Sequence, residues 1–149
     1  MHSENSITIN APLEEVFRVA SDLVSWPRIL PHYRHVRILR NVDGAAILQM
    51  AAWRRWIPIQ WTSELRVDET GKEIHFHHLK AFTKGMKVVW KFENISEGVR
   101  VTIHHDLQPS IPLIGKFVAE KIIGSFFIRF IANQTLTHMK KHIETHYGA

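Results

Sequence analysis

The stretch IPIQWTSELRV, residues 57–67, alternates strictly between two kinds of side chain. Its odd positions are mostly apolar, with Trp61, Ser63 and Leu65 at the centre, whereas its even positions are polar apart from Pro58. Successive side chains of a β-strand point to opposite faces, so this period of two predicts a strand with one buried and one solvated face. The stretch therefore decides the fold in favour of a sheet with a single apolar face.

Short polar turns divide the neighbouring sequence into further segments of strand length. Gly supplies the positive φ that tight hairpins need, and four glycines stand at such turns: Asp43-Gly44, Thr70-Gly71, Lys84-Gly85 and Glu97-Gly98. We expect an antiparallel meander of about six strands, preceded by a short strand at residues 6–9. Continued alternation directs four notable side chains to the apolar face, namely Phe76, His78, Trp90 and His105.

Helical patterns flank this meander. Asn10-Ala11-Pro12 is typical of a helix start, and a buried stripe at helical spacing follows it. A second short helix is expected up to Trp26, with Pro31 ending it. A long helix, roughly residues 113–146, closes the chain; it is apolar nearly all round in its first half. We predict a single α+β domain spanning residues 1–149, in which a curved antiparallel sheet of about seven strands wraps around this last helix and leaves an apolar cavity.

Composition excludes several classes of protein. The chain has 149 residues, of which 45% are hydrophobic and 22% charged, which is typical of one folded domain and not of a disordered chain. The absence of cysteine excludes a disulfide scaffold and a thiolate metal site. The most apolar stretch carries four charged residues and the N-terminus lacks the pattern of a signal peptide, so we expect a soluble, cytoplasmic protein. The formal net charge of +5 comes from scattered residues with no basic run interleaved with aromatics, so no nucleic-acid partner is expected.

Two motifs near the start carry a family resemblance. NSITINAPLEEVF, residues 5–17, and DLVSWPRILPHY, residues 22–33, resemble the opening of polyketide cyclase/dehydrase-like members of the START/Bet v1-like (SRPBCC) superfamily. The predicted order of elements is similar to the helix-grip fold of that superfamily. The resemblance implies that the space between sheet and last helix holds a hydrophobic small molecule such as a lipid, a quinone or a polyketide.

The resemblance also implies roles for particular residues. Tyr33 matches a pocket tyrosine of the aromatase/cyclases, and Trp61 with Ser63 matches a Trp-x-Ser strand that lines their cavity. Those enzymes place a pocket arginine two residues after the serine, where this chain has Leu65. Arg66 is adjacent, but alternation directs it to the other face. This departure favours ligand binding over cyclase chemistry.

Candidate site residues follow from the resemblance and from the apolar face. The candidates for proton transfer or hydrogen bonding to carbonyls are Tyr33, Ser63, His78 and His105. Alternatively, the two histidines are hydrogen-bonded core residues and the aromatics simply fill a core. The predicted ligand-binding residues are Tyr33, Trp61, Ser63, Leu65, Phe76, His78, Trp90, His105, Phe126 and Phe130.

No metal or cofactor is expected. His75, His77 and His104 share the outer face, but a meander separates their strands by roughly 9–10 Å, too far for one zinc ion, and no acidic third ligand is in place. The sequence has neither a P-loop nor a dinucleotide fingerprint, and no serine lies in a nucleophile elbow.

Three functions stay open at this stage. The first is a binding or carrier protein for a hydrophobic small molecule, the second a polyketide cyclase/dehydratase acting on a carrier-bound poly-keto chain, and the third a protein-interaction module. Lys116, Lys121 and Arg129 on the last helix would suit an acyl carrier protein or an anionic membrane surface, although ordinary solvated charges are the simpler explanation. The apolar start of that helix would also suit a homodimer contact.

Overall fold

The computed structural model describes residues 2–80, 83–107 and 128–147. Its elements follow the predicted order, with one strand, short helices, six strands and a final helix. In sequence they are β1 (His2–Ile9), α1 (Leu13–Ser21), η1 (Leu23–Ser25), α2 (Trp26–Ile29), β2 (Tyr33–Val42), β3 (Ala45–Arg54), β4 (Ile57–Asp68), β5 (Glu73–His78), β6 (Lys87–Ile95), β7 (Gly98–Asp106) and α4 (Arg129–Tyr147).

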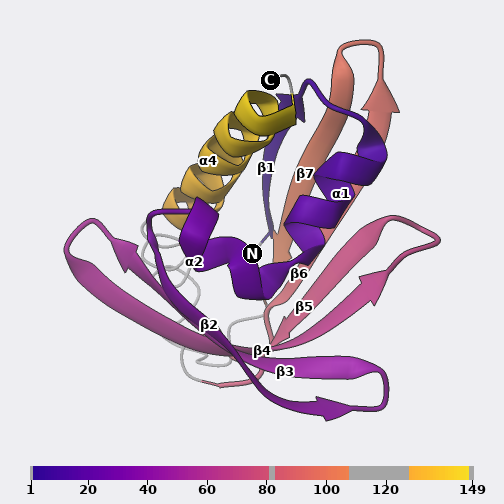
Figure 1. Cartoon of the computed structure of the whole chain (residues 1–149). Coiled ribbons are helices and arrows are strands. Elements are labelled where there is room, and N and C mark those ends of the chain that lie inside the picture. Colours follow the sequence, from indigo (N-terminus) through magenta and orange to yellow (C-terminus); the bar gives the residue numbers. More distant parts are fainter. Residues whose placement is uncertain (1, 81–82, 108–127, 148–149) are drawn as a thin grey trace.

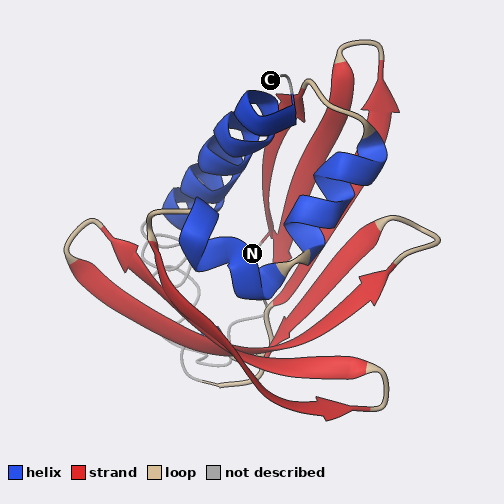
Figure 2. Ribbon diagram, viewed as in Figure 1, coloured by secondary structure: helices blue, strands red, loops and turns tan. Residues whose placement is uncertain are grey.

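The seven strands form one antiparallel sheet in the order β1-β7-β6-β5-β4-β3-β2. The sheet curves strongly, and the helices lie on its concave side (Figures 1 and 2). Consecutive strands from β2 to β7 are neighbours in the sheet, whereas β1 pairs with the last strand and forms the edge opposite β2. The predicted α+β helix-grip architecture is confirmed.

Alternation correctly identifies the buried face of β5, β6 and β7. Ile74, Phe76 and His78 are buried on β5, and the predicted inward residues of β6 and β7 are buried as well. The prediction is wrong for Val67, which is 37% exposed at the end of β4. This end of the longest strand extends beyond the helices, so a side chain on the inner face has nothing to cover it.

The turns behave largely as the glycines predict. Asp43 and Gly44 take φ values of 48° and 78° between β2 and β3, as a tight hairpin requires. The turn between β3 and β4 lies at Arg55 and Trp56 and needs no glycine, because Arg55 itself adopts a φ of 56°. Gly98 has a second constraint, since a side chain there would collide with the backbone of β1 at Ile9.

The helices cover the concave face through the predicted stripes. Pro12 caps α1, and Val16, Phe17 and Ala20 are buried beneath it. The expected stripe of α4, from Ala132 through Leu136 and Met139 to Ile143, is buried. The predicted first half of that helix, residues 113–127, lies outside the described residues. Within the described ranges, none of the helices has the length and apolar character needed to cross a membrane.

Candidate functional site

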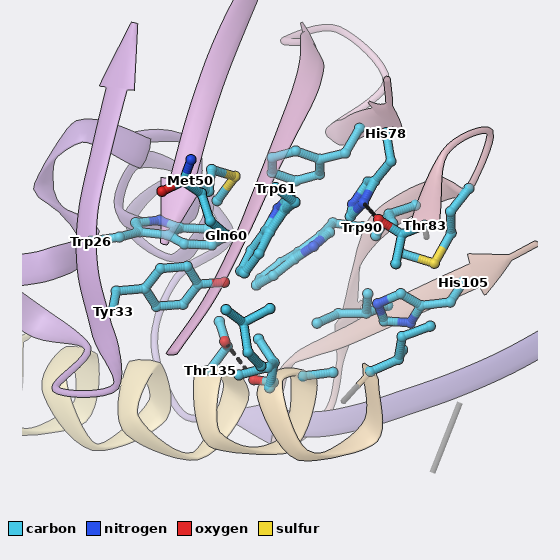
Figure 3. A pocket seen from close by; sticks show the side chains of 18 residues that line it. Trp26, Tyr33, Met50, Gln60, Trp61, His78, Thr83, Trp90, His105 and Thr135 are labelled. Atoms are coloured by element: carbon cyan, nitrogen blue, oxygen red, sulfur yellow. Dashed lines mark hydrogen bonds between the residues drawn. The ribbon is translucent and has the colours of Figure 1, made fainter. Parts of the chain in front are cut away.

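A cavity of about 90 Å³ lies between the concave face of the sheet and α4 (Figure 3). Residues of strands β2 to β7 line one side, and α4 closes the cavity through Ile131, Ala132 and Thr135, with Ile128 just before that helix. An engineered apolar cavity of the same order of size, about 150 Å³, binds small aromatic molecules. The position is the one predicted from the sequence, between the sheet and the last helix.

Aromatic side chains form most of the wall. Trp26 contacts three other rings, with ring centroids 5.2 Å from Tyr33, 5.4 Å from Trp90 and 6.3 Å from Phe76. Its indole N–H donates a hydrogen bond of 3.2 Å to the carbonyl oxygen of Ala20, which fixes the ring in place. Flat, rigid walls of this kind provide a large contact area at little cost in side-chain entropy.

One end of the cavity carries two buried histidines (Figure 3). His78 stacks parallel to Trp61, with centroids 6.1 Å apart, and its Nδ1 shares a hydrogen bond of 2.9 Å with the Thr83 hydroxyl. His105 is buried beside it, and its Nδ1 has no hydrogen-bond partner. Burial, supplemented by neighbouring histidines, lowers the pKa of His78 to about 4 and that of His105 to about 3. Both imidazoles are therefore neutral at physiological pH.

The other end carries Tyr33 and Thr135. The Thr135 hydroxyl donates to the Ile131 carbonyl oxygen at 2.7 Å and therefore accepts from Nε2 of His32 at 2.9 Å, which assigns the proton of that imidazole to Nε2. Burial lowers the pKa of His32 to about 4 and raises the pKa of the Tyr33 phenol. The phenol thus stays protonated and can donate a hydrogen bond to a ligand.

The described lining of the cavity carries no charged side chain. Among the described residues that line it, none carries a lysine, arginine, aspartate or glutamate side chain. Its polar groups are hydroxyls and two neutral imidazoles. Because placing an unpaired charge in an apolar site is costly, the arrangement favours a neutral guest over an ion.

The structure brings together six of the ten predicted ligand-binding residues at this cavity: Tyr33, Trp61, Phe76, His78, Trp90 and His105. Phe126 lies outside the described residues. The remaining three do not line the cavity. Ser63 is fully buried opposite His78 in the strand register, and Phe130 lies under the guanidinium of Arg54 at 5.0 Å.

Leu65 packs against the core opposite Phe76 and is likewise absent from the cavity wall. The exchange of arginine for leucine at this position therefore does not by itself decide the polarity of the cavity. Arg66 points outward as alternation predicts, and it contacts Glu64 at 3.0 Å.

Sequence reasoning missed several wall residues, among them Trp26, Gln60, Thr83 and Thr135. Trp26 had a usable signal, because it lies in the quoted opening motif immediately before Pro27. Thr135 is adjacent to the predicted apolar stripe of the helix, but its residue type does not indicate whether it faces the cavity or the solvent. Thr83 lies in the segment before β6 and has no periodic pattern to place it.

The outer face corrects one argument about metals. His104 lies within 2.9 Å of a carboxylate oxygen of Glu4, and His2 is 3.4 Å from the same oxygen. Potential ligand atoms of all three residues lie within 4.8 Å of one another. The expectation that no acidic group accompanies the outward histidines was wrong here, because β1 pairs with β7 and brings Glu4 opposite His104. Mutual hydrogen bonds account for this exposed cluster without an ion.

Fold and cavity together define an α+β helix-grip protein that encloses an apolar site. The chain belongs to the family described as polyketide cyclase/dehydrase and lipid transport, whose sequence profile matches residues 9–139.

Individual relatives agree with this assignment. The chain is 28% identical over 104 residues to a Streptomyces halstedii protein named "Putative polyketide cyclase", covering 66% of this chain and 93% of that protein. A Streptomyces cyaneus protein of the same name is 24% identical over 120 residues, which cover 75% of this chain and 77% of that one. Among solved structures, the Zhui aromatase/cyclase from Streptomyces sp. R1128 superposes with a TM-score of 0.81 at 17% identity, over 97% of this chain and 93% of its own.

Proposed function

We propose that this protein binds a neutral, flat, hydrophobic molecule of the aromatic or poly-keto class in the cavity between its sheet and α4. The observation that carries the proposal is the combination of an aromatic wall with polar groups that are all uncharged at neutral pH. Such a wall gains contact area from a flat guest. The hydroxyl of Tyr33 at one end and the imidazoles at the other can hydrogen-bond to carbonyl or hydroxyl oxygens on that guest.

The same features count against a free fatty acid. A carboxylate would need a cation, and the described part of the wall offers none. Protonating His78 or His105 to provide one would have to overcome the burial that lowers both pKa values far below 7. A ligand with ketone or phenol oxygens avoids this cost.

Cyclisation and dehydration of a bound poly-keto chain is a second candidate function. Three observations favour it. Two relatives carry the name "Putative polyketide cyclase", and one solved structure of the same fold is an aromatase/cyclase. Two neutral imidazoles face the cavity, where one could accept a proton from a methylene group between two ketones. The protonated Tyr33 phenol, at the opposite end, could donate a hydrogen bond to another carbonyl oxygen of the same chain.

The bond changes of this second function balance without a cofactor. The enolate carbon attacks a second carbonyl carbon of the same chain, a C–C bond forms, and the new alkoxide takes back the proton held by the imidazole. Loss of that hydroxyl with an adjacent proton then releases water. Holding the chain folded would supply much of the rate, because well-oriented intramolecular reactions gain up to about 7–11 kcal/mol. The low pKa values keep both imidazoles unprotonated but weaken them as bases, so binding is the primary proposal.

A matched pair of probes tests the binding proposal. 2-Naphthol and 2-naphthoate share a flat two-ring skeleton and differ in charge, and quenching of the wall tryptophans reports on the binding of each. We expect naphthol to bind at least about tenfold more tightly, a difference of about 1.4 kcal/mol. Equal or tighter binding of naphthoate would overturn the electrostatic argument.

Variants connect that binding to the cavity. Ala132→Phe projects a ring from α4 into the site and should abolish naphthol binding, whereas Lys91→Gln on the exposed face of β6 should leave it unchanged. For the cyclase candidate, His78→Gln and His105→Gln should slow ring closure of a poly-keto thioester while naphthol still binds. If both variants cyclise the thioester at the wild-type rate, the histidines have no chemical role.

A further inference from the structure

The positive charge of this protein is concentrated in one part of the chain. Residues 23–63 contain six arginines, no lysine and a single acidic residue, Asp43. The excess of five equals the formal net charge of the whole chain, +5, so all other residues together are balanced. This stretch spans η1, α2, β2, β3 and the first half of β4. The scattered appearance of the charges in the sequence is therefore misleading.

Two β-bulges gather three of these arginines onto one face. Arg34, Arg37 and Arg40 are three residues apart, a spacing that would alternate between faces in a regular strand. The register of β2 against β3 shifts between Tyr33 and His35 and again between Ile38 and Arg40. At each shift, one extra residue of β2 returns the next arginine to the same face of the sheet. Arg37 therefore lies opposite Gln49 and Arg40 opposite Ile47, two residues of β3 that point to one side.

That side is the outer face of the sheet. Arg34 lies there too, because its guanidinium stacks 5.0 Å above the ring of Trp53, which has the same orientation as Gln49 along β3. The helices cover only the opposite, concave face (Figure 1). The three arginines thus line the outer side of the edge strand β2, with nothing in the described structure packed over them.

Exposed tryptophans accompany the arginines. Trp53 is 40% exposed, and Trp56, at the turn between β3 and β4, is 80% exposed. Arg55 precedes it in the same turn. We give the name arginine–tryptophan face to Arg34, Arg37, Arg40 and Trp53 on the outer side of the sheet, together with the exposed Trp56 at the adjoining turn. The nearest acidic side chain on the outer side of β4, Glu64, is engaged by Arg66 at 3.0 Å and so does not neutralise it.

We propose that the arginine–tryptophan face docks this protein on a membrane surface that contains anionic phospholipid. Guanidinium groups pair with lipid phosphates, and indole rings partition to the boundary between headgroups and acyl chains. Each basic residue near an anionic membrane strengthens binding by about fivefold, and the attraction decreases with salt.

The shape and composition of this face favour a membrane over the other anionic partners. Trp56 projects from a hairpin turn rather than from a groove, which suits insertion into a soft interface. An acidic protein would be expected to meet a flat or hollowed apolar patch. Nucleic acid would use the arginines, but would need its bases unstacked to reach tryptophans spread along a convex sheet.

Docking would also orient the cavity. The residues that follow the Trp56 turn on β4 include Ile59, Gln60 and Trp61, all of which line the cavity wall. The tip that meets the membrane therefore belongs to the same hairpin as one wall of the site. Membrane docking does not depend on the identity of the ligand. The docking proposal can therefore fail while the proposed function holds, and the proposed function can fail while docking holds.

Vesicle sedimentation tests the proposal with the full chain. Phosphatidylcholine vesicles with and without roughly one-third phosphatidylglycerol provide the anionic and the neutral surface. We expect strong binding to the anionic vesicles at low salt and little to the neutral ones. Arg37→Gln with Arg40→Gln should weaken binding by roughly 25-fold, from the contribution of about fivefold per residue.

A charge-matched control separates the face from overall charge. Lys87→Gln with Lys91→Gln removes the same charge from exposed positions on β6 and should leave vesicle binding within about twofold of wild type. Equal loss in both double variants would overturn the proposal, as would absence of binding to anionic vesicles.

Three further measurements complete the test. Quenching by lipids with brominated acyl chains should decrease in Trp56→Phe, because that indole is the one expected to insert. An RNA homopolymer or an acidic carrier protein that binds while anionic vesicles do not would assign the face to another partner. Naphthol binding, measured on the same variants, should be unchanged throughout, which shows that their cavity is intact.

Discussion

Acidification is expected to destabilise this protein through the histidines at its cavity. His78 and His105 are each 7% exposed and neutral in the folded protein. Their pKa values, about 4 and about 3, lie far below the value of about 6.5 that an imidazole has in an unfolded chain. Between these values the unfolded state binds more protons than the folded state, so the free energy of unfolding rises with pH.

The sign and the size of the effect follow directly. Above about pH 6.5 both states are neutral and the contribution is fully present; it is lost as the pH falls towards the folded values. At one pKa unit per 1.36 kcal/mol, acidification from about pH 7 to about pH 4.5 removes roughly 2–3 kcal/mol per histidine. Two such groups account for about 5 kcal/mol, a large share of the stability of an ordinary domain.

Urea denaturation at a series of pH values, followed by tryptophan fluorescence, measures this dependence. His78→Gln with His105→Gln should flatten the acid limb of the stability profile by roughly the same 5 kcal/mol. His77→Gln, an exposed position on the opposite face of β5, should retain most of the wild-type slope. If the double variant has the same pH dependence as wild type, the two imidazoles are not buried in their neutral form.

Three other expectations concern stability, and urea denaturation checks each. Gly98→Ala should cost several kcal/mol of stability, because its φ of 133° disfavours a side chain and a Cβ would collide with the Ile9 carbonyl oxygen. Gly44→Ala, with open space around it, should cost only about 1 kcal/mol. Similar losses in the two variants would show that the contact between Gly98 and β1 is not tight. Ser63→Ala should leave stability unchanged or raise it by about 1 kcal/mol, since the buried hydroxyl has no partner, and a clear loss would reveal a hydrogen bond. Leu136→Ala should cost roughly 2–5 kcal/mol beneath α4, and a loss well below 1 kcal/mol would mean that the helix is not tightly packed there.

Local pattern predicted most of the fold correctly. The faces of β5 to β7 follow from a period of two, and the stripe of α4 follows from helical spacing. Both depend only on which side of an element meets water. The inner face of β2 could not be assigned in the same way, because its two bulges break the period that such reasoning needs. The prediction that Val67 is buried at the end of β4 was wrong for a different reason. Alternation shows which face of the sheet a side chain is on, but it does not show how far the helices cover that face.

The candidate site was predictable only in part. The histidines and most of the aromatics on the apolar face could be named from alternation. Ser63 was predicted as well and points to the inner face of the sheet, but it is buried among other side chains and does not line the cavity. Curvature of the sheet decides which inward residues reach the open space and which pack between neighbours, and the sequence pattern does not encode curvature.

By itself, the sequence determined the class of fold, the family and the apolar face of the sheet, because these depend on periodicity and on short contiguous motifs. Only the tertiary structure decided which residues meet. It placed Trp26 against Trp90, joined Glu4 to His104 across the β1–β7 register, and aligned three arginines on the outer side of β2. Each of these contacts joins distant segments or depends on a local register shift. Strand register and packing determine them jointly, and neither is a property of any single stretch of the chain.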